Sequence, residues 1–250
     1  MMNRKNLITL ITLILIIIPI FLPVSFSFAS TEDVYVDAPV ALLMDSASGK
    51  ILYERNAREK RFPASTTKIM TAILALENRK LTDTATVSEN AVSTIPYSYT
   101  IANLQIGEVL TYEQLLLVLM LPSANDAATV IAEDIGGSVE GFASMMNQKA
   151  REIGCENTNF VNANGIHHEN HYTTAYDLAL IGQYAMKNEP FRKIVSSVKY
   201  TLPTTEKYDK EDRIFTNNNR LINSNSSNYY QYATGIKTGY TDPARKLYCG

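Results

Sequence analysis

Residues 63–79 read PASTTKIMTAILALENR, and this stretch decides the fold. Its apolar side chains recur at the three- and four-residue spacing of an α-helix, at Ile69, Met70, Ile73, Leu74 and Leu76. The apolar stripe is wide enough for the helix to be buried on most of its sides. We therefore expect a buried helix over residues 66–79, with the rest of the protein packed around it.

Ser65 and Lys68 lie at the start of this helix, three residues apart. Residues at this spacing share a helix face, so the two side chains are within hydrogen-bond reach. A serine hydroxyl is a weak nucleophile until a base takes its proton, and a lysine whose pKa is lowered by burial can be that base. The backbone amides at the helix start favour negative charge beside Ser65. The pair predicts a lysine-activated nucleophilic serine.

Two further short motifs follow. Ser123-Ala124-Asn125 interrupts two expected helices, where Ser123 can relay a proton and Asn125 can hold a substrate carbonyl. Lys237-Thr238-Gly239 lies on a late strand and offers a cation and a hydroxyl that suit a carboxylate. Gly239 has no side chain, so an extended substrate can lie against this strand as an added strand.

The individual motifs are common patterns, and only Lys237-Thr238-Gly239 is unique in the chain. Ser196 and Lys199 repeat the first spacing, while residues 88–90 and 226–228 match the second motif. The order of the three motifs and their contexts support a functional role: a helix start, a bend between helices and a late strand. The alternative makes Ser65 a helix cap and Lys68 a solvated charge.

The remaining segments predict an α+β protein. A hairpin is expected over residues 39–54, and Thr111 begins a capping box with Gln114. Further helices are expected at residues 112–121, 126–135, 139–153 and 175–187. Strands are expected at residues 194–202 and 235–241, with an asparagine- and serine-rich loop at 217–228. Because strands occur at both chain ends, we expect one antiparallel sheet built from both ends, with a helical middle.

Residues 1–29 have the pattern of an export signal. Arg4 and Lys5 precede an apolar run over residues 7–24, and Ser27-Phe28-Ala29 supplies a cleavage site. We expect cleavage after Ala29, a globular domain over residues 30–250 and a location outside the cytoplasm. The apolar run is near the minimum length for a membrane span, so the alternative is an uncleaved signal that associates with the membrane.

Composition excludes several classes of protein. The chain has 23 basic and 25 acidic residues, which excludes the basic surface of a nucleic-acid-binding protein. Two cysteines exclude a disulfide-dense scaffold. Export permits a disulfide between Cys155 and Cys249, but we expect these cysteines to be unpaired.

The sequences around the motifs, at residues 63–71, 121–128 and 234–241, closely resemble the serine-type D-alanyl-D-alanine carboxypeptidases of peptidase family S11. These are the low-molecular-mass penicillin-binding proteins. Residues 171–177 and the opening hairpin are similar to them too. The resemblance implies a β-lactamase/transpeptidase-like fold, no cofactor and no metal. It also implies peptidoglycan stem peptides ending in D-Ala-D-Ala as substrate, and β-lactams as inhibitors.

The resemblance also assigns roles to single residues. Ser65 attacks the carbonyl between the two D-alanines and Lys68 accepts its proton. The backbone amides of Ser65 and Tyr240 stabilise the oxyanion, and Ser123 passes a proton to the leaving D-alanine. Asn125 positions the substrate. The terminal carboxylate is bound by the strand motif, Lys237 with Thr238.

Two alternative activities are weighed against this. A class A β-lactamase uses a glutamate four residues before an asparagine, and no glutamate here has that spacing. His167, His168, Glu169 and His171 form a cluster suited to metal in residue type, but they lie within one short loop, whereas zinc ligands usually come from more than one element. We expect a solvated loop instead.

A further alternative is a catalytically defective, truncated carboxypeptidase. In the family that the sequence resembles, further strands and a helix follow the Lys-Thr-Gly strand, and a second β domain commonly follows these. Here eleven residues follow Gly239. We therefore expect the terminal strands and helix, and the C-terminal β domain, to be absent. The strand that carries Lys237 would then be left at an exposed sheet edge.

Overall fold

The computed structural model describes residues 36–250. The expected signal at residues 1–29 lies outside the described residues. The helices are η2 (Ala64–Thr67), α2 (Lys68–Asn78), α3 (Glu89–Ser93), α4 (Tyr112–Met120), α5 (Asn125–Gly136), α6 (Val139–Ile153), α7 (Ala175–Ala185), α8 (Glu189–Val195) and η3 (Arg220–Ile222). The strands are β1 (Ala41–Met44), β2 (Ile51–Arg55), β3 (Thr84–Thr86), β4 (Val109–Thr111), β5 (Lys199–Leu202), β6 (Arg213–Thr216), β7 (Lys237–Thr241) and β8 (Arg245–Cys249).

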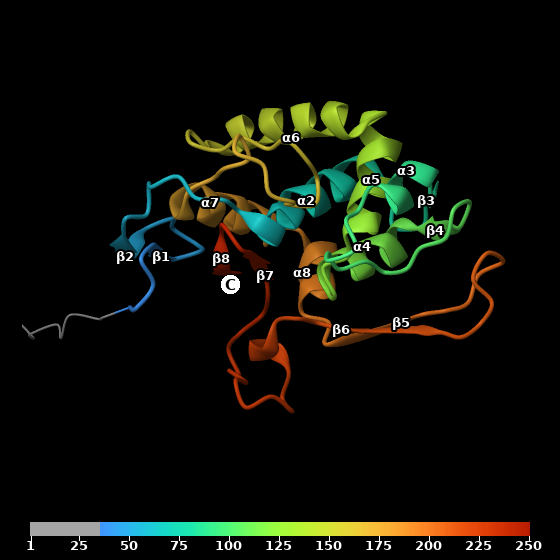
Figure 1. Cartoon of the computed structure of the whole chain (residues 1–250). Coiled ribbons are helices and arrows are strands. Elements are labelled where there is room, and N and C mark those ends of the chain that lie inside the picture. Colours follow the sequence, from blue (N-terminus) through green and yellow to red (C-terminus); the bar gives the residue numbers. More distant parts are fainter. Residues whose placement is uncertain (1–35) are drawn as a thin grey trace, which may run out of the picture. The chain divides into compact units, whose positions relative to one another are not determined.

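The expected central helix is present as α2. Its first eight residues are buried, and it packs against α4, α5, α6, α7 and α8, so it lies in the middle of the helical layer (Figure 1). The start differs from the expectation, because residues 64–67 form a 3₁₀ turn before the α-helix begins at Lys68. Ser65 therefore lies on a tight turn rather than on a regular α-helix.

The capping box at Thr111 is confirmed. The Gln114 amide donates to Thr111 Oγ1 at 3.2 Å, and the Thr111 amide donates to Gln114 Oε1 at 2.8 Å. These bonds satisfy two of the backbone donors that a helix start leaves without partners. The box fixes the start of α4, whose other end leads into the bend that carries Ser123.

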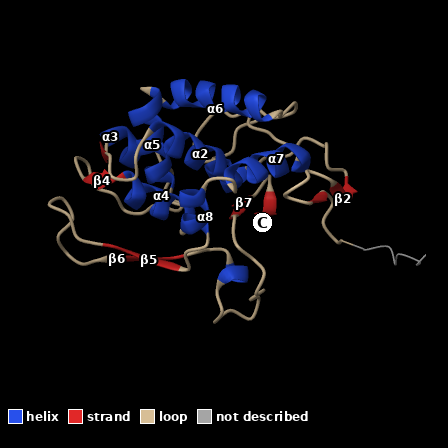
Figure 2. Ribbon diagram, turned by 180° about the vertical axis from the view of Figure 1, so that it is seen from behind, coloured by secondary structure: helices blue, strands red, loops and turns tan. Residues whose placement is uncertain are grey.

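The α+β class is confirmed. The strands from the two chain ends, however, do not form the single sheet that the sequence predicts. Hairpin β1–β2 and hairpin β7–β8 both pack on α7, but among the described residues each is a separate two-stranded antiparallel sheet. An apolar groove of about 810 Å³ lies between β1 and β8, with α7 along it. The two hairpins thus meet on one helix without forming a continuous ladder (Figure 2).

The expected strand at residues 194–202 is wrong in its first half. Asn188 caps a helix there, since its Oδ1 accepts the Phe191 amide at 3.0 Å, and Pro190 occupies the first turn. Proline is favoured at this position because its missing N–H would have no helical partner. Helix α8 therefore runs to Val195, and β5 begins only at Lys199.

The strand that carries Lys237, β7, has one neighbouring strand. Residues 245–249 form β8, which pairs with β7 from Lys237 opposite Cys249 to Thr241 opposite Arg245. The expectation that β7 lacks its following strand is therefore wrong, because the last residues of the chain supply that partner, while the other edge of β7 has no strand partner among the described residues.

Two further structural findings bear on the sequence expectations. Cys155 and Cys249 are buried and unpaired, and burial raises the pKa of each thiol to about 12. Within residues 36–250, no helix has both the length and the hydrophobicity needed to cross a bilayer.

Candidate active site

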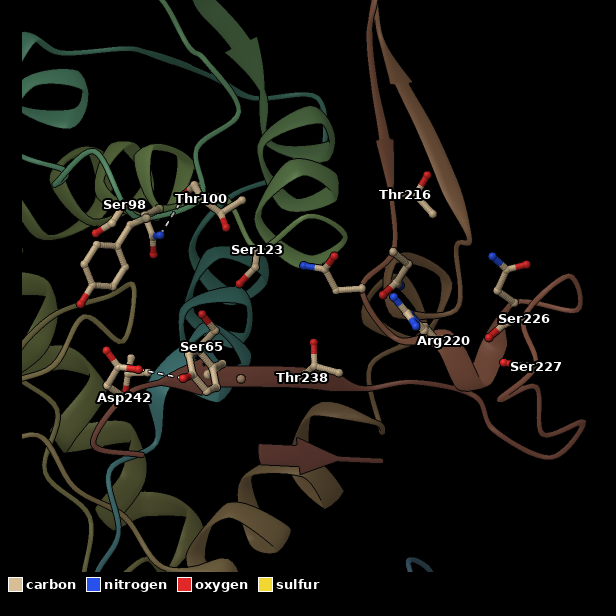
Figure 3. A pocket seen from close by; sticks show the side chains of 18 residues that line it. Ser65, Ser98, Thr100, Ser123, Thr216, Arg220, Ser226, Ser227, Thr238 and Asp242 are labelled. Carbon is tan, nitrogen blue, oxygen red and sulfur yellow. Dashed lines mark hydrogen bonds between the residues drawn. The ribbon is translucent and has the colours of Figure 1, made fainter. Parts of the chain in front are cut away.

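The three motifs meet in one cleft of about 960 Å³ (Figure 3). Turn η2 supplies one side, the bend between α4 and α5 another, and strand β7 the floor. The predicted site residues that line it are Ser65, Ser123, Asn125, Thr238, Gly239 and Tyr240. Lys68 and Lys237, the remaining two, are buried beside it, with exposures of 0% and 2%. The structure therefore brings together all eight predicted residues.

The Lys68 amine has three oxygen neighbours. Its Nζ lies 3.2 Å from Ser65 Oγ, 2.8 Å from Asn125 Oδ1 and 2.5 Å from the Asn164 backbone oxygen. Burial and the nearby Lys237 charge hold the Lys68 pKa well below its usual value, and Asp126 opposes them. Burial therefore favours the neutral amine of Lys68 over the ammonium form.

The neighbours of a neutral Lys68 decide where its lone pair points. The amide oxygen of Asn125 and the carbonyl oxygen of Asn164 only accept hydrogen bonds, so they take the two amine hydrogens. Only the Ser65 hydroxyl can donate to the remaining lone pair. The orientation of the Asn125 amide is fixed in turn, because its Nδ2 donates to the Thr100 carbonyl at 2.9 Å. This arrangement can deprotonate Ser65.

Two glycines let the chain close around the turn that carries Ser65. A Cβ on Gly239 of β7 would lie 3.2 Å from the Ser65 nitrogen. A Cβ on Gly165 would lie 1.9 Å from the Ala64 oxygen, and Gly165 also has a φ of +84°. Ala64 itself has a φ of 45°, which is costly for a residue with a side chain. The nucleophile thus sits on a strained turn that is clamped from both sides.

Ser123 also has an unusual backbone. Its φ is 75°, and its buried Oγ has no hydrogen-bond partner among residues 36–250. A buried hydroxyl without a partner costs free energy, and a strained backbone adds to that cost. The Ser123 hydroxyl lies at the cleft and is available to a substrate group (Figure 3).

Lys237 is the second buried cation. Its Nζ donates to the Thr238 carbonyl at 3.0 Å, and burial lowers the pKa of this amine to about 7. A negative charge bound in the cleft would favour the protonated form. Lys237 can therefore respond to an anionic ligand.

Sequence reasoning missed two contributors to the site. Asp126 accepts backbone amides from Ala102, Leu104 and Ala127 at 2.9–3.1 Å, and burial raises the pKa of its carboxyl. It joins α5 to the loop after Thr100. Its position directly after Asn125 was the available signal. Asn164 carries no such signal, because it acts through its backbone carbonyl.

The histidines have separate partners. His171 Nδ1 accepts the Val161 amide at 3.3 Å and its Nε2 lies 2.9 Å from Thr67 Oγ1, while burial lowers the pKa of the ring to about 3. The neutral ring therefore supports the turn beside Lys68. His167 packs edge-on against Phe62. The described part of the chain holds no group of three or more histidine, cysteine or acidic side chains placed for a metal.

Known proteins are similar to this chain in sequence and in fold. The model of the family described as D-alanyl-D-alanine carboxypeptidase, peptidase S11, matches residues 27–249. D-alanyl-D-alanine carboxypeptidase DacF of Bacillus subtilis is 37% identical over 224 residues, which are 88% of this chain and 54% of that protein. The D-alanyl-D-alanine carboxypeptidase of Streptomyces sp. K15 is 36% identical over 82% of this chain and 72% of that protein.

The solved structures agree. The crystal structure of the Streptomyces K15 DD-transpeptidase superposes with a TM-score of 0.78 at 33% identity, over 85% of this chain and 84% of that chain. The chain spans about half the length of several relatives, including the Bacillus subtilis protein at 54% and the Escherichia coli DacA protein at 51%. Family match, sequence identity and fold all lead to one assignment: this chain belongs to the D-alanyl-D-alanine carboxypeptidase family, peptidase S11.

Proposed function

We propose that the chain is a serine-type D-Ala-D-Ala carboxypeptidase that removes the terminal D-alanine of peptidoglycan stem peptides through an acyl-enzyme on Ser65. The observation that carries this proposal is the environment of Lys68. Two acceptor oxygens occupy its hydrogens, so the lone pair of the neutral amine faces the Ser65 hydroxyl. The same geometry argues against Ser65 as a helix cap, because its side chain faces the lysine rather than a backbone amide.

The acylation step uses three side chains. Lys68 takes the hydroxyl proton as Ser65 Oγ attacks the carbonyl carbon between the two D-alanines. The amides of Ser65 and Tyr240 donate to the oxyanion that forms. As the C–N bond breaks, Ser123 passes a proton to the leaving amine. Water then attacks the ester at Ser65, which releases the shortened peptide and regenerates the serine.

Strand β7 and the bend before α5 hold the substrate. Asn125 Nδ2 and the extended edge of β7 at Gly239 bind the peptide backbone. Thr238 and Lys237 receive the terminal carboxylate, whose charge restores the proton on Lys237, since the pKa of this amine is only about 7 in the free protein. The β-lactams acylate Ser65 by the same attack and block the enzyme.

The location follows from the substrate. Peptidoglycan lies outside the cytoplasmic membrane, so we assign the protein to the cell wall or the outer face of the cytoplasmic membrane, as an exported, penicillin-binding enzyme of cell-wall remodelling and cell shape. The export signal at residues 1–29 supports this, and an uncleaved signal would tether the enzyme to the membrane.

Release of D-alanine from a peptide ending in D-Ala-D-Ala tests the proposal. Ser65→Ala should abolish release. Ser196→Ala is the matched control, because Ser196 and Lys199 have the same spacing but Ser196 is exposed just after α8 and does not line the cleft. Release that survives Ser65→Ala, or a folded wild type without release, would contradict the proposal. Hydrolysis of penicillin as fast as that of the peptide would favour a β-lactamase instead.

A further inference from the structure

Thr71 is a fully buried polar residue of α2 that takes no part in the proposed reaction. It lies three residues after Lys68, so the two side chains share one face of the helix. A threonine inside a helix can donate its hydroxyl to the carbonyl four residues earlier. Here the hydroxyl donates at 2.6 Å to the carbonyl of Ala163, in the loop between α6 and α7. Thr71 therefore joins α2 to a segment 92 residues away in the sequence.

The same loop supplies an acceptor for the Lys68 amine. The carbonyl of Asn164, the residue after Ala163, accepts from Lys68 Nζ at 2.5 Å. Two consecutive carbonyls of one loop thus receive hydrogen bonds from two donors on one helix face, Thr71 and Lys68. The Thr71 bond and the Lys68 bond therefore hold the same short segment against α2.

The loop itself is braced by its asparagine side chains. Asn162 Oδ1 accepts the Gly165 amide at 2.8 Å, and its Nδ2 donates to the Ile166 carbonyl at 2.9 Å. Asn164 Oδ1 accepts the Ile166 amide at 2.9 Å. Because these bonds fix the shape of residues 162–166, the contacts that hold the loop on α2 set the position of the Asn164 carbonyl.

We propose that Thr71 is a positioning residue for Lys68, an inference that rests on the proposed role of Lys68 as the base for Ser65. During acylation Lys68 changes from amine to ammonium, so its own bond to the Asn164 carbonyl changes in strength. The Thr71 hydroxyl is uncharged throughout, and its bond to Ala163 holds the loop in both states. With the Asn164 carbonyl held in place, the lone pair of the neutral amine stays directed at Ser65.

Two charged groups and one neutral ring face Lys68 from the elements around it. Lys237 of β7 lowers the pKa of Lys68, and Asp126 of α5 raises it. The ring of His171, with a pKa of about 3, is uncharged at neutral pH. Thr71 carries no charge, so loss of its hydroxyl acts on Lys68 only through the loop carbonyl. Because a carbonyl binds an ammonium more strongly than an amine, displacement of this carbonyl should lower the pKa of Lys68 further.

Two variants that both lack the threonine methyl test the inference: Thr71→Ser keeps the hydroxyl, and Thr71→Ala removes it. With a chromogenic β-lactam at saturation, we expect Thr71→Ala to acylate Ser65 about fivefold more slowly or worse, while the dissociation constant of the initial complex stays within about twofold of the wild type. Thr71→Ser should keep at least about half of the wild-type rate. Tyr112→Phe is the control, because it removes a hydroxyl from a buried tyrosine that does not line the cleft.

Titration of Lys68 is a second measurement, and it requires no turnover. NMR of protein labelled with carbon-13 lysine reports this titration, once Lys68→Met has assigned the Lys68 signal. We expect a lower Lys68 pKa in Thr71→Ala than in Thr71→Ser, and the wild-type value in Tyr112→Phe.

Equal acylation rates in folded Thr71→Ala and Thr71→Ser would overturn the inference, and so would equal Lys68 pKa values. A rate loss that comes only from weaker initial binding would also overturn it, since the position of the base affects the chemical step. Denaturant unfolding checks that both variants are folded, and Thr71→Val, of the same shape without the donor, replaces Thr71→Ala if that variant unfolds. A wild type that releases no D-alanine contradicts the proposed function, while the Lys68 titration still decides the role of Thr71.

Discussion

At Lys68 two physical effects oppose each other. Burial and the Lys237 charge favour the neutral amine, whereas Asp126 and three oxygen neighbours favour the ammonium. The pKa of Lys68 is well below its usual value, so burial and the Lys237 charge dominate. Replacement of Ser65 removes the nucleophile, but replacement of Lys68 tests whether this balance produces a base.

Lys68→Met should lower the acylation rate of Ser65 by about 10²–10⁴-fold, the usual contribution of a general base. In the wild type the rate should rise with pH as Lys68 loses its proton, and then level off. Stopped-flow acylation by a chromogenic β-lactam across pH measures both effects. Lys199→Met, an exposed lysine with the same spacing from Ser196, should leave the rate unchanged. A pH-independent rate in the wild type would refute the role of Lys68.

Lys237 should make stability depend on pH. Its pKa falls from 10.5 to about 7 on folding, so between these values the unfolded chain binds a proton that the folded chain lacks. Stability from this residue therefore rises with pH, by at most about 1.4 kcal/mol per pH unit. Denaturant unfolding at pH 7 and pH 10 measures this dependence. Lys237→Met should have a higher free energy of unfolding than the wild type at pH 7, and the difference should shrink at pH 10. A constant difference would contradict the buried amine.

At the scale of elements, the site depends on contacts that hold η2, α5 and β7 against one another. Gly165 and Gly239 allow the chain to approach η2, and Asp126 joins α5 to the loop after Thr100. These contacts lie between segments far apart in the sequence. Their loss should therefore change the geometry of the cleft before it changes the helices.

Gly165→Ala should impair acylation, because its Cβ would meet the Ala64 oxygen at 1.9 Å and displace the turn that carries Ser65. Gly154→Ala is the matched control: this glycine also has positive φ, at +101°, but its Cβ would meet nothing within 4 Å. Both variants should lose about 1–2 kcal/mol from backbone strain. Only Gly165→Ala should acylate slowly, and equal acylation rates would contradict the clamp.

Asp126→Ala should destabilise the protein by about 3 kcal/mol or more, since it leaves the amides of Ala102 and Leu104 buried without an acceptor. It should also weaken substrate binding, because Thr100 lines the cleft beside this loop. Denaturant unfolding and the KM for D-alanine release measure the two effects. Asp209→Ala, in the exposed turn between β5 and β6, is the control. A loss below about 1 kcal/mol would show that water replaces the carboxylate.

At the scale of the whole molecule, the sequence predicts the parts that depend on local periodicity. The helix at residues 139–153 has its expected bounds because local interactions set both ends: the Ser138 side chain caps its start and Gly154, with a positive φ, ends it. The site was predictable since its motifs carry recognisable side chains. The path of β8 was not, because residues 245–249 form a strand only through pairing with β7. Asn164 was missed for a different reason, since it contacts Lys68 through its backbone carbonyl rather than through a recognisable side chain.

The buried cysteines report on the packing of the whole domain. Cys249 ends β8 and its Sγ lies against Gly182 of α7, while Cys155 follows α6. We expect both thiols to react slowly with a thiol reagent in the native state, since burial raises the pKa of each to about 12. Both should react at once in denaturant without reductant. If no thiol reacts in denaturant, Cys155 and Cys249 form a disulfide. Fast labelling of the native protein would indicate that β8 does not pack against α7.

Mass spectrometry of the penicillin-treated protein shows directly whether Ser65 forms the acyl-enzyme. We expect one penicilloyl adduct per chain, on the proteolytic peptide that contains Ser65, with no adduct in Ser65→Ala and a full adduct in Ser196→Ala. An adduct on any other residue, or a folded wild type that takes up no penicillin, would contradict this expectation.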